Sequence, residues 1–315
     1  MTDADKPARP AQKKNLFAQL ELDTRLLGMI GAFIILCIGF HLVTDGRFLT
    51  SRNIFNLTIQ TVSVAIMATG MVFVIVTRNI DLSVGSLLAT CSAVMAMTQT
   101  FITPEVFGLG LNHPATAPIA IVVGIATGVV IGAFQGYIIG YLGVPAFIVT
   151  LGGLLVWRNV AWYLTNGQTI GPLDRNFMQF GGINGTLGET WSWIIGIIAV
   201  LFAFYSFWRS RRSKIAHEFP VKPVWAEVVM AGITAIAILG FVVVLNNYDV
   251  PRRRLQQMFE ARGEVMPDGF TQGYGLPISV LLLIAVAIVM TIVARRTRLG
   301  RYIFATGGNP DTAEL

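Results

Sequence analysis

The sequence predicts an all-α, polytopic membrane protein. Hydrophobic residues make up 54% of the 315 residues and charged residues only 13%, and the mean hydropathy is +0.66. A soluble domain carries about 25% charged residues, so a chain this apolar lacks the polar surface to cover a globule. This composition argues against soluble enzymes and nucleic-acid-binding proteins. In such a chain, the net charge of +6 indicates where the loops lie and does not imply a nucleic-acid partner.

Eight long stretches with few or no Asp, Glu, Lys or Arg residues follow a polar tail at residues 1–20. About 20 such residues cross a bilayer as a helix, which satisfies its own backbone there. The uncharged stretch from Val106 to Trp157 is too long for one span, and Gly/Pro-containing turns divide it in two. The predicted spans are 26–43, 53–77, 82–101, 118–140, 146–165, 190–208, 226–246 and 276–294. The tail has no signal-peptide pattern, so we expect residues 21–315 to form one transmembrane domain after an uncleaved tail.

The distribution of Lys and Arg predicts a cytoplasmic N-terminus. If the tail is inside and the spans alternate, 15 of the 23 basic residues fall on inner segments and seven on outer ones. Four of the outer seven lie in the 247–275 loop beside four acidic residues, so that loop is nearly neutral. The same alternation places residues 295–315 in the cytoplasm.

The sequence shows little catalytic equipment. Its histidines and cysteines are scattered: His41, His113, His217, Cys37 and Cys91. It contains no Walker A motif and no zinc-protease or serine-hydrolase motif. Carboxylates occur at the ends of the predicted spans and not in their middle, which disfavours an ion-coupled carrier without excluding one. We therefore expect no enzyme activity, no cofactor and no metal in this chain.

Residues 79–86, Asn-Ile-Asp-Leu-Ser-Val-Gly-Ser, form the most structured local pattern. Asp81 precedes an apolar run and can cap the third helix, with Ser83 nearby. Gly85 then allows close backbone packing. The pattern predicts either a helix cap at the cytoplasmic boundary or a gating motif.

Arg158 lies inside the fifth predicted span. An unpaired guanidinium there is costly, so it should face the bundle or water and bind helix carbonyls, Asn159 or Asn166. This predicts a structural anchor or the lining of a polar translocation path. The neighbouring Trp157, Trp162 and Tyr163 are expected to pack in the core or the interface, with sugar stacking as the alternative.

Two further patterns concern packing and lipid. Glycines recur every fourth residue in the fourth span and predict a close-packing face, with a place in a substrate path as the alternative; they are Gly124, Gly128, Gly132, Gly136 and Gly140. The basic run at residues 209–214 predicts a topology determinant that contacts membrane lipid.

Several stretches, taken together, resemble the membrane permease subunits of bacterial ABC importers for monosaccharides. In family order they are 48–57, 70–75, 80–86, 144–152, 164–168 and 300–309. The segment Ile-Asp-Leu-Ser-Val-Gly-Ser at 80–86 is the most specific of them. Within the family, Thr44-Asp45-Gly46 and the extra helix after the basic run are most similar to the xylose branch.

The resemblance implies an inner-membrane permease that pairs with a second permease subunit, two cytoplasmic ATPases and a periplasmic sugar-binding protein, and that moves a monosaccharide by alternating access. It also implies that Gly307, Gly308, Asn309 and Ala313 belong to the loop that couples to the ATPase. The family has about ten helices, and its coupling region continues into further helices. We therefore expect this chain to be C-terminally truncated. The remaining alternatives are an ion-coupled carrier and a fragment that does not transport.

Overall fold

The computed structural model of the chain describes residues 24–308 and separates into two compact units. The first unit contains the described residues up to Phe55 together with Leu187–Leu276. The second unit contains Asn56–Thr186 and the described residues from Pro277 onward.

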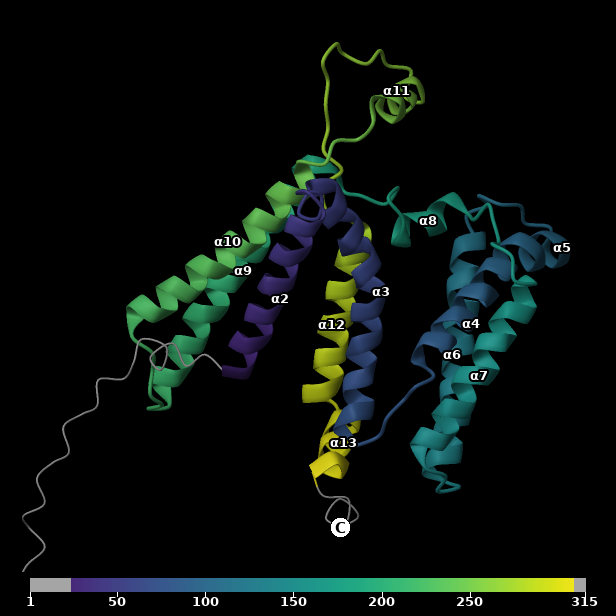
Figure 1. The fold of residues 1–315 in the computed structure, drawn as a ribbon, viewed down its shortest axis with the longest axis horizontal. Coiled ribbons are helices and arrows are strands. Elements are labelled where there is room, and N and C mark those ends of the chain that lie inside the picture. The colour runs from purple at the N-terminus through teal and green to yellow at the C-terminus, as the bar shows by residue number, and fades with distance from the viewer. Residues whose placement is uncertain (1–23, 309–315) are drawn as a thin grey trace, which may run out of the picture. The chain divides into compact units, whose positions relative to one another are not determined.

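The described residues contain eight helices that are long and apolar enough to cross a membrane. The part of the chain that is described has no strand, only isolated β-bridges. The spans, labelled in Figure 1, are α2 (Thr24–Val43), α3 (Ser51–Val76), α4 (Val84–Met97) with its continuation to Phe107, α6 (Thr116–Gly140), α7 (Ala146–Thr165), α9 (Gly188–Ala216), α10 (Val224–Asn246) and α12 (Ile278–Arg296). The predicted all-α polytopic fold is confirmed.

The span that begins with α4 changes its helical pitch before it ends. A π-helical turn, η1 (Thr98–Ile102), follows α4, and α5 (Thr103–Phe107) completes the span. Pro104 lies in the first turn of α5, directly after the π-helical turn. Gly108 then ends the helix in the left-handed conformation. The span therefore runs past its predicted end at residue 101.

The first unit contains a helical hairpin of α9 and α10, which lie side by side in Figure 1. Gly196 of α9 faces Val242 of α10 so closely that an added Cβ would lie 2.8 Å from a valine methyl group. At the other end, Arg211 Nη1 lies 2.8 Å from Glu227 Oε2. The helix α9 continues through the basic run to Ala216, past the predicted end at 208, because Arg and Lys are good helix formers outside the hydrocarbon.

The end of the hairpin opposite the ion pair is closed by backbone and aromatic contacts. Leu276 N–H donates to Ser192 Oγ at 2.7 Å, and the Tyr248 and Tyr274 rings lie 4.8 Å apart. From here the loop after α10 projects outward and contains α11 (Arg252–Glu260) (Figure 1). Leu255 anchors α11 because it is fully buried.

The second unit contains a bundle in which α4 packs against α6 and α7. The residues that α4 buries are small, namely Ser86, Thr90 and Ala93. Small side chains allow membrane helices to approach closely, and hydroxyl groups can then bond across the gap. This bundle contains two of the sequence segments that resemble the permease family, 80–86 and 144–152.

A tight corner links α12 to α13 (Arg298–Gly308) in the second unit. Thr297 Oγ1 donates to Val293 O and accepts the N–H of Gly300 at 3.2 Å, which caps the new helix. Gly300 is buried against the last turn of α12, where a Cβ would collide with the carbonyl oxygens of Val293 and Ala294. A glycine is therefore required for this change of direction.

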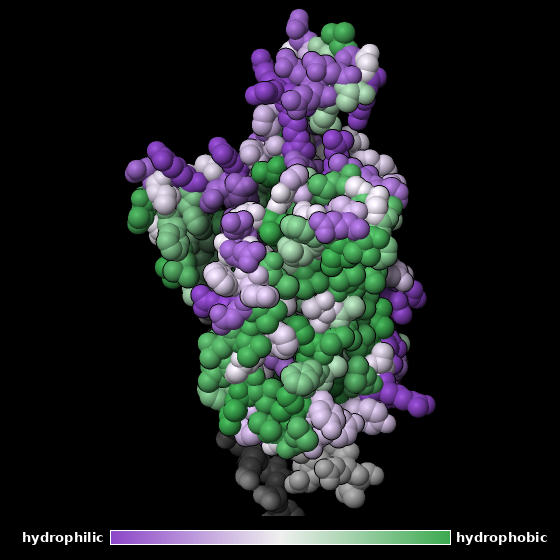
Figure 2. All heavy atoms as spheres, turned by 90° about the vertical axis from the view of Figure 1, so that its right-hand side faces the viewer, coloured by the Kyte–Doolittle hydropathy of each residue, from purple (hydrophilic) through white to green (hydrophobic). Residues whose placement is uncertain are grey.

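The helices expose many large apolar side chains, as expected of surfaces that meet lipid or other membrane helices. Figure 2 shows hydrophobic side chains over most of the visible sides of the helices and hydrophilic ones gathered toward their ends. Examples on α6 and α7 are Val130, Phe134, Leu155 and Trp162, each more than half exposed.

Candidate functional site

The segment between α3 and α4 forms a closed turn around Asp81. Asp81 Oδ1 accepts hydrogen bonds from the backbone N–H and the hydroxyl of Ser83, both at 2.7 Å. Ser83 occupies the N-cap position of α4, although its own side chain makes no capping bond. The carboxylate of Asp81 therefore organises the start of the helix through Ser83.

A row of buried polar side chains continues from this turn along the interfaces of α4 with α6 and α7. Gln135 Nε2 of α6 donates to Ser83 Oγ at 3.2 Å. Thr150 Oγ1 of α7 lies 3.1 Å from Ile80 O, and Thr90 Oγ1 of α4 lies 2.7 Å from Trp157 O. We call Ser83, Thr90, Gln135 and Thr150 the polar seam. All four are at least nine-tenths buried, so their bonds form away from water.

Gly85 does not have the role expected from the sequence. It is exposed on the first turn of α4, and among the described residues no atom comes within 4 Å of a Cβ placed there. The close approach in this bundle is made instead by Gly153 of α7, where a Cβ would collide with the Gln135 amide. The expectation failed because a glycine next to a cap does not reveal which face of the helix meets a neighbour.

The glycine stripe of α6 divides into two parts. Gly124 and Gly128 lie against Met95 and Cys91 of α4, which is the close packing expected from the sequence. The remaining members have no described atom within 4 Å of an added Cβ, and they line a cavity instead; they are Gly132, Gly136 and Gly140.

This cavity has a volume of about 440 Å³ and is lined by residues of α3, the 77–81 segment, α4, α6, α7 and α13. Its polar lining includes Thr77, Asn79, Asp81, Gln135 and Thr150, and Ile303 contributes from α13. We refer to it as the α13 cavity. Within residues 24–308, no group of three or more His, Cys, Asp or Glu side chains could hold a metal ion.

The glycines expected to couple to an ATPase lie at the end of α13. A Cβ at Gly307 would collide with the carbonyl oxygen of Val76, the last residue of α3. Arg78 Nη2 donates to Gly308 O at 3.0 Å. Asn309 and Ala313, the other two residues expected in this role, lie outside the described residues.

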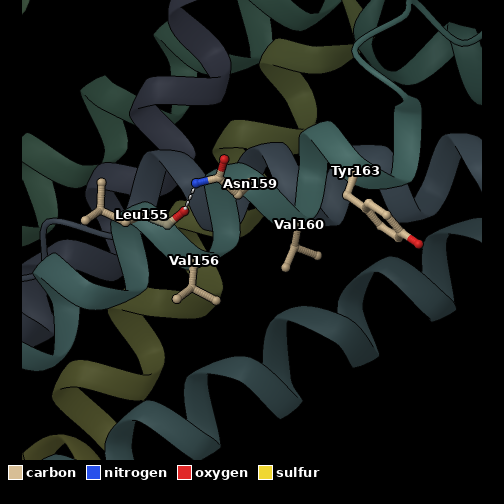
Figure 3. Close-up of a pocket in the computed structure, with 5 residues that line it drawn as sticks. All are labelled: Leu155, Val156, Asn159, Val160 and Tyr163. Carbon is tan, nitrogen blue, oxygen red and sulfur yellow. Dashed lines mark hydrogen bonds between the residues drawn. The ribbon is translucent and has the colours of Figure 1, made fainter.

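Arg158 and Asn159 lie on the exposed side of α7. Asn159 Nδ2 donates to Leu155 O of its own helix at 2.7 Å (Figure 3). No hydrogen bond or ion pair of Arg158 is found among the described residues, so neither Asn159 nor Asn166 binds it there. Asn166 ends α7 in the left-handed conformation, about 12 Å along the helix axis from Arg158.

Figure 3 also shows a hollow on the surface of α7, lined by Leu155, Val156, Asn159, Val160 and Tyr163. All five side chains come from one helix, and Val156, Val160 and Tyr163 project toward the same side. Asn159 is the one amide in this apolar lining. A hollow with walls from a single helix is a surface that another helix or chain can complete.

A buried carboxylate at the other end of the α4–α6–α7 bundle was missed by the sequence analysis. Asp174 is fully buried and caps α8 (Arg175–Gly181), where its Oδ1 accepts the N–H groups of Asn176 and Phe177. Its Oδ2 accepts the N–H of Asn112 at 2.7 Å, and its own N–H donates to Gln99 Oε1 at 3.0 Å. An aspartate just before a short helix is a recognisable N-cap signal, but its distant partners cannot be inferred from spacing.

The eight apolar spans define a multi-pass integral membrane protein. The chain belongs to the family described as the branched-chain amino acid transport system / permease component, and residues 53–315 match that family's model.

Several curated proteins are similar to this chain. The xylose transport system permease protein of Escherichia coli K12 is 34% identical over 93% of this chain, and the match spans 65% of that protein. The xylose permease of Haemophilus influenzae is 31% identical over 95% of this chain and 70% of its own length. The ribose import permease protein of E. coli K12 is 40% identical over 52% of this chain and 49% of its own length. No solved structure matches the chain.

Proposed function

We propose that this chain is the membrane-spanning permease of an ABC importer that moves a monosaccharide by alternating access, and that the sugar is xylose. The observation that carries the proposal is the similarity to xylose transport permeases over more than nine-tenths of the chain. The partial match to a ribose permease supports the wider class of pentose importers.

The proposal includes a set of partners. A cytoplasmic ATPase supplies the energy, a periplasmic sugar-binding protein delivers the substrate, and a second copy of the permease completes the pathway. Residues 21–315 form the permease domain in the inner membrane, and the tail at 1–20 is cytoplasmic. The excess of basic residues on the inner segments supports this orientation.

The exposed face of α13 is the surface proposed to meet the ATPase. Leu299, Tyr302 and Phe304 are about half to two-thirds exposed on this short helix, which also exposes Arg298 and Arg301. A mixed apolar and basic face is suited to a protein partner that covers the apolar side chains. In the same orientation, the basic run at 209–214 contacts anionic lipid headgroups.

Arg158 and Asn159 are proposed to line the translocation path, with Asn166 at its end. A guanidinium facing hydrocarbon is costly, and the charge of Arg158 has no partner in the described part of the chain. A water-filled path or a partner subunit satisfies it better than lipid. The Asp81–Ser83–Gly85 motif is proposed to act in gating, because it joins the start of α4 to the polar seam.

The experiment is sugar uptake into proteoliposomes that contain the full-length permease, its ATPase and its binding protein. Xylose uptake should require ATP and each protein component, and ribose should compete less well. Arg158→Gln should lower uptake at least tenfold, whereas Arg175→Gln, a matched change in an exposed loop helix, should leave it unchanged. Equal uptake by wild-type protein and Arg158→Gln would remove Arg158 from the path.

A further inference from the structure

The end of α13 is attached to the segment between α3 and α4. Gly307 lies against the carbonyl of Val76, and Arg78 donates a hydrogen bond to Gly308 O at 3.0 Å. The hydrogen bond joins residues 230 positions apart in the sequence, so this attachment is a tertiary contact of the fold and not a local turn. A movement of α13 therefore acts directly on residues 76–78.

Arg78 occupies a backbone position that favours glycine. Its φ is +62°, in the left-handed region that L side chains rarely adopt. Glycine would fit this backbone with less strain, so the arginine is explained better by its side chain than by its backbone. The side-chain interaction shown by the structure is the bond to α13.

The other end of the same segment is fixed in the α4–α6–α7 bundle. Thr150 of α7 donates to Ile80 O, and Asp81 binds Ser83, which in turn accepts a hydrogen bond from Gln135 of α6. Residues 78–83 thus connect α13 to three helices through a chain of hydrogen bonds. Such a connection can transmit a displacement only if neighbouring groups leave room for it.

The α13 cavity provides that room. It has a volume of about 440 Å³, and its lining includes Asp81 from the connecting segment and Ile303 from α13. Gly132 and Gly136 form part of its wall without side chains that would fill it. The stripe of glycines in α6 is therefore used for packing in one half and for free volume in the other.

We propose that residues 76–83 are the link that carries movement of α13 into the α4–α6–α7 bundle. Arg78 and Gly307 are its positioning residues, and the α13 cavity leaves room for the link to move. This inference rests on the proposed function, because the movement of α13 is ascribed to the ATPase. Beyond the proposed function, the inference names the residues through which ATP hydrolysis by the partner moves the helices of this chain.

Arg78→Gly tests the link because it relieves the backbone while it removes the side-chain bond. The test uses the full-length permease with its ATPase and binding protein in proteoliposomes, and it measures ATP hydrolysis and xylose uptake together. We expect normal thermal stability and continued hydrolysis, with about tenfold less sugar moved per ATP, which is within the usual range of coupling between sites. Glu218→Gly is the matched control, since Glu218 also has a positive φ and is exposed. It should leave the ratio unchanged.

Filling the cavity provides a second, independent variant. Gly136→Leu adds volume inside the cavity, and Ala133→Leu adds a similar volume on the exposed surface of the same helix. We expect the first to reduce uptake without a loss of stability and the second to change neither. A wild-type ratio of sugar to ATP in both Arg78→Gly and Gly136→Leu would overturn the inference.

The two proposals can fail separately. Wild-type protein that shows no ATP-dependent uptake contradicts the proposed function but not the link itself. The link is then tested by amide hydrogen exchange in the purified permease. Arg78→Gly should speed exchange in residues 77–90 and leave the exchange rates of α9 and α10 unchanged. Exchange in residues 77–90 at the wild-type rate would overturn the link.

Discussion

The α4–α6–α7 bundle and the α9–α10 hairpin solve the same packing problem in different ways. The bundle is held by buried polar side chains that bond from helix to helix, such as Thr90 to Trp157 O and Gln135 to Ser83. The hairpin packs apolar surfaces, as at Gly196 and Val242, and places its ion pair between Arg211 and Glu227 at one end.

This difference predicts which of the two regions can rearrange. Hydrogen bonds between buried groups have discrete partners, so a bundle of this kind can exchange one set for another when helices move. An apolar hairpin has no such alternatives and is suited to a supporting role. Two of the six segments that resemble the permease family, 80–86 and 144–152, fall in the bundle.

The largest effect is expected at Asp174, the buried carboxylate that closes one end of the α4–α6–α7 bundle. Asp174→Ala should destabilise the second unit by about 3 kcal/mol, because three backbone N–H groups lose their acceptor in a buried site. The free energy of unfolding in mixed detergent micelles measures this loss. Asp174→Asn should fall between wild type and alanine, since the amide oxygen still caps α8. A loss below about 1 kcal/mol for alanine would show that this end is not closed by the carboxylate.

A methyl group added at the closest helix contact separates the two packing modes. Gly153→Ala should cost about 2 kcal/mol, because the methyl group displaces the Gln135 amide and breaks its bond to Ser83. Gly196→Ala should cost about 1 kcal/mol less, since Val242 alone must shift and alanine improves helix propensity. Unfolding of both variants in the same micelles gives the comparison. Equal costs would mean that the polar contact adds nothing to the packing penalty.

Removing one bond of the polar seam should have a smaller effect. Thr90→Val keeps the shape of the side chain but loses its donor to Trp157 O, at a cost of about 0.6 kcal/mol, the average for hydrogen bonds between membrane helices. Thr234→Val is the control on α10, because its hydroxyl bonds within its own helix at Met230 O. If Thr234→Val lowers the free energy of unfolding as much as Thr90→Val does, the interhelical hydrogen bond adds no stability beyond that of a bond within one helix.

The smallest effect is expected at the ion pair of the hairpin. Glu227→Gln should change the free energy of unfolding by less than about 0.5 kcal/mol, because both side chains are between a fifth and a quarter exposed and water screens their attraction. The change should shrink further at high salt. A loss above about 2 kcal/mol would place this pair in a buried environment and weaken the contrast with the bundle.

The sequence was sufficient for the membrane spans and insufficient for their contacts. Long stretches with at most one charged residue identify the eight spans because hydrocarbon disfavours charge over a fixed thickness. The short helices α8, α11 and α13 were missed, since seven to eleven polar or mixed residues give no strong periodic signal. The end of α9 was predicted too early because its uncharged stretch ends at Arg209, whereas the helix continues to Ala216.

The candidate site shows the same limit. The Asp81–Ser83 turn is a local interaction and follows from spacing of two residues. Its partner Gln135 is 52 residues from Ser83, and the contact of Arg78 with Gly308 spans 230 residues, so neither follows from spacing. The glycine pattern identified one face of α6. It did not show which glycines pack against α4 and which line the cavity, because that depends on how far along α6 the contact with α4 extends.

The source of energy for uptake tests the central claim most directly. Xylose uptake should be measured in proteoliposomes that contain the full-length permease, its ATPase and its binding protein, with an ionophore at constant ATP and with ATP removed at a constant ion gradient. The permease account predicts that uptake persists with the ionophore and stops without ATP. Uptake that stops with the ionophore while ATP is held constant would contradict it and indicate an ion-coupled carrier.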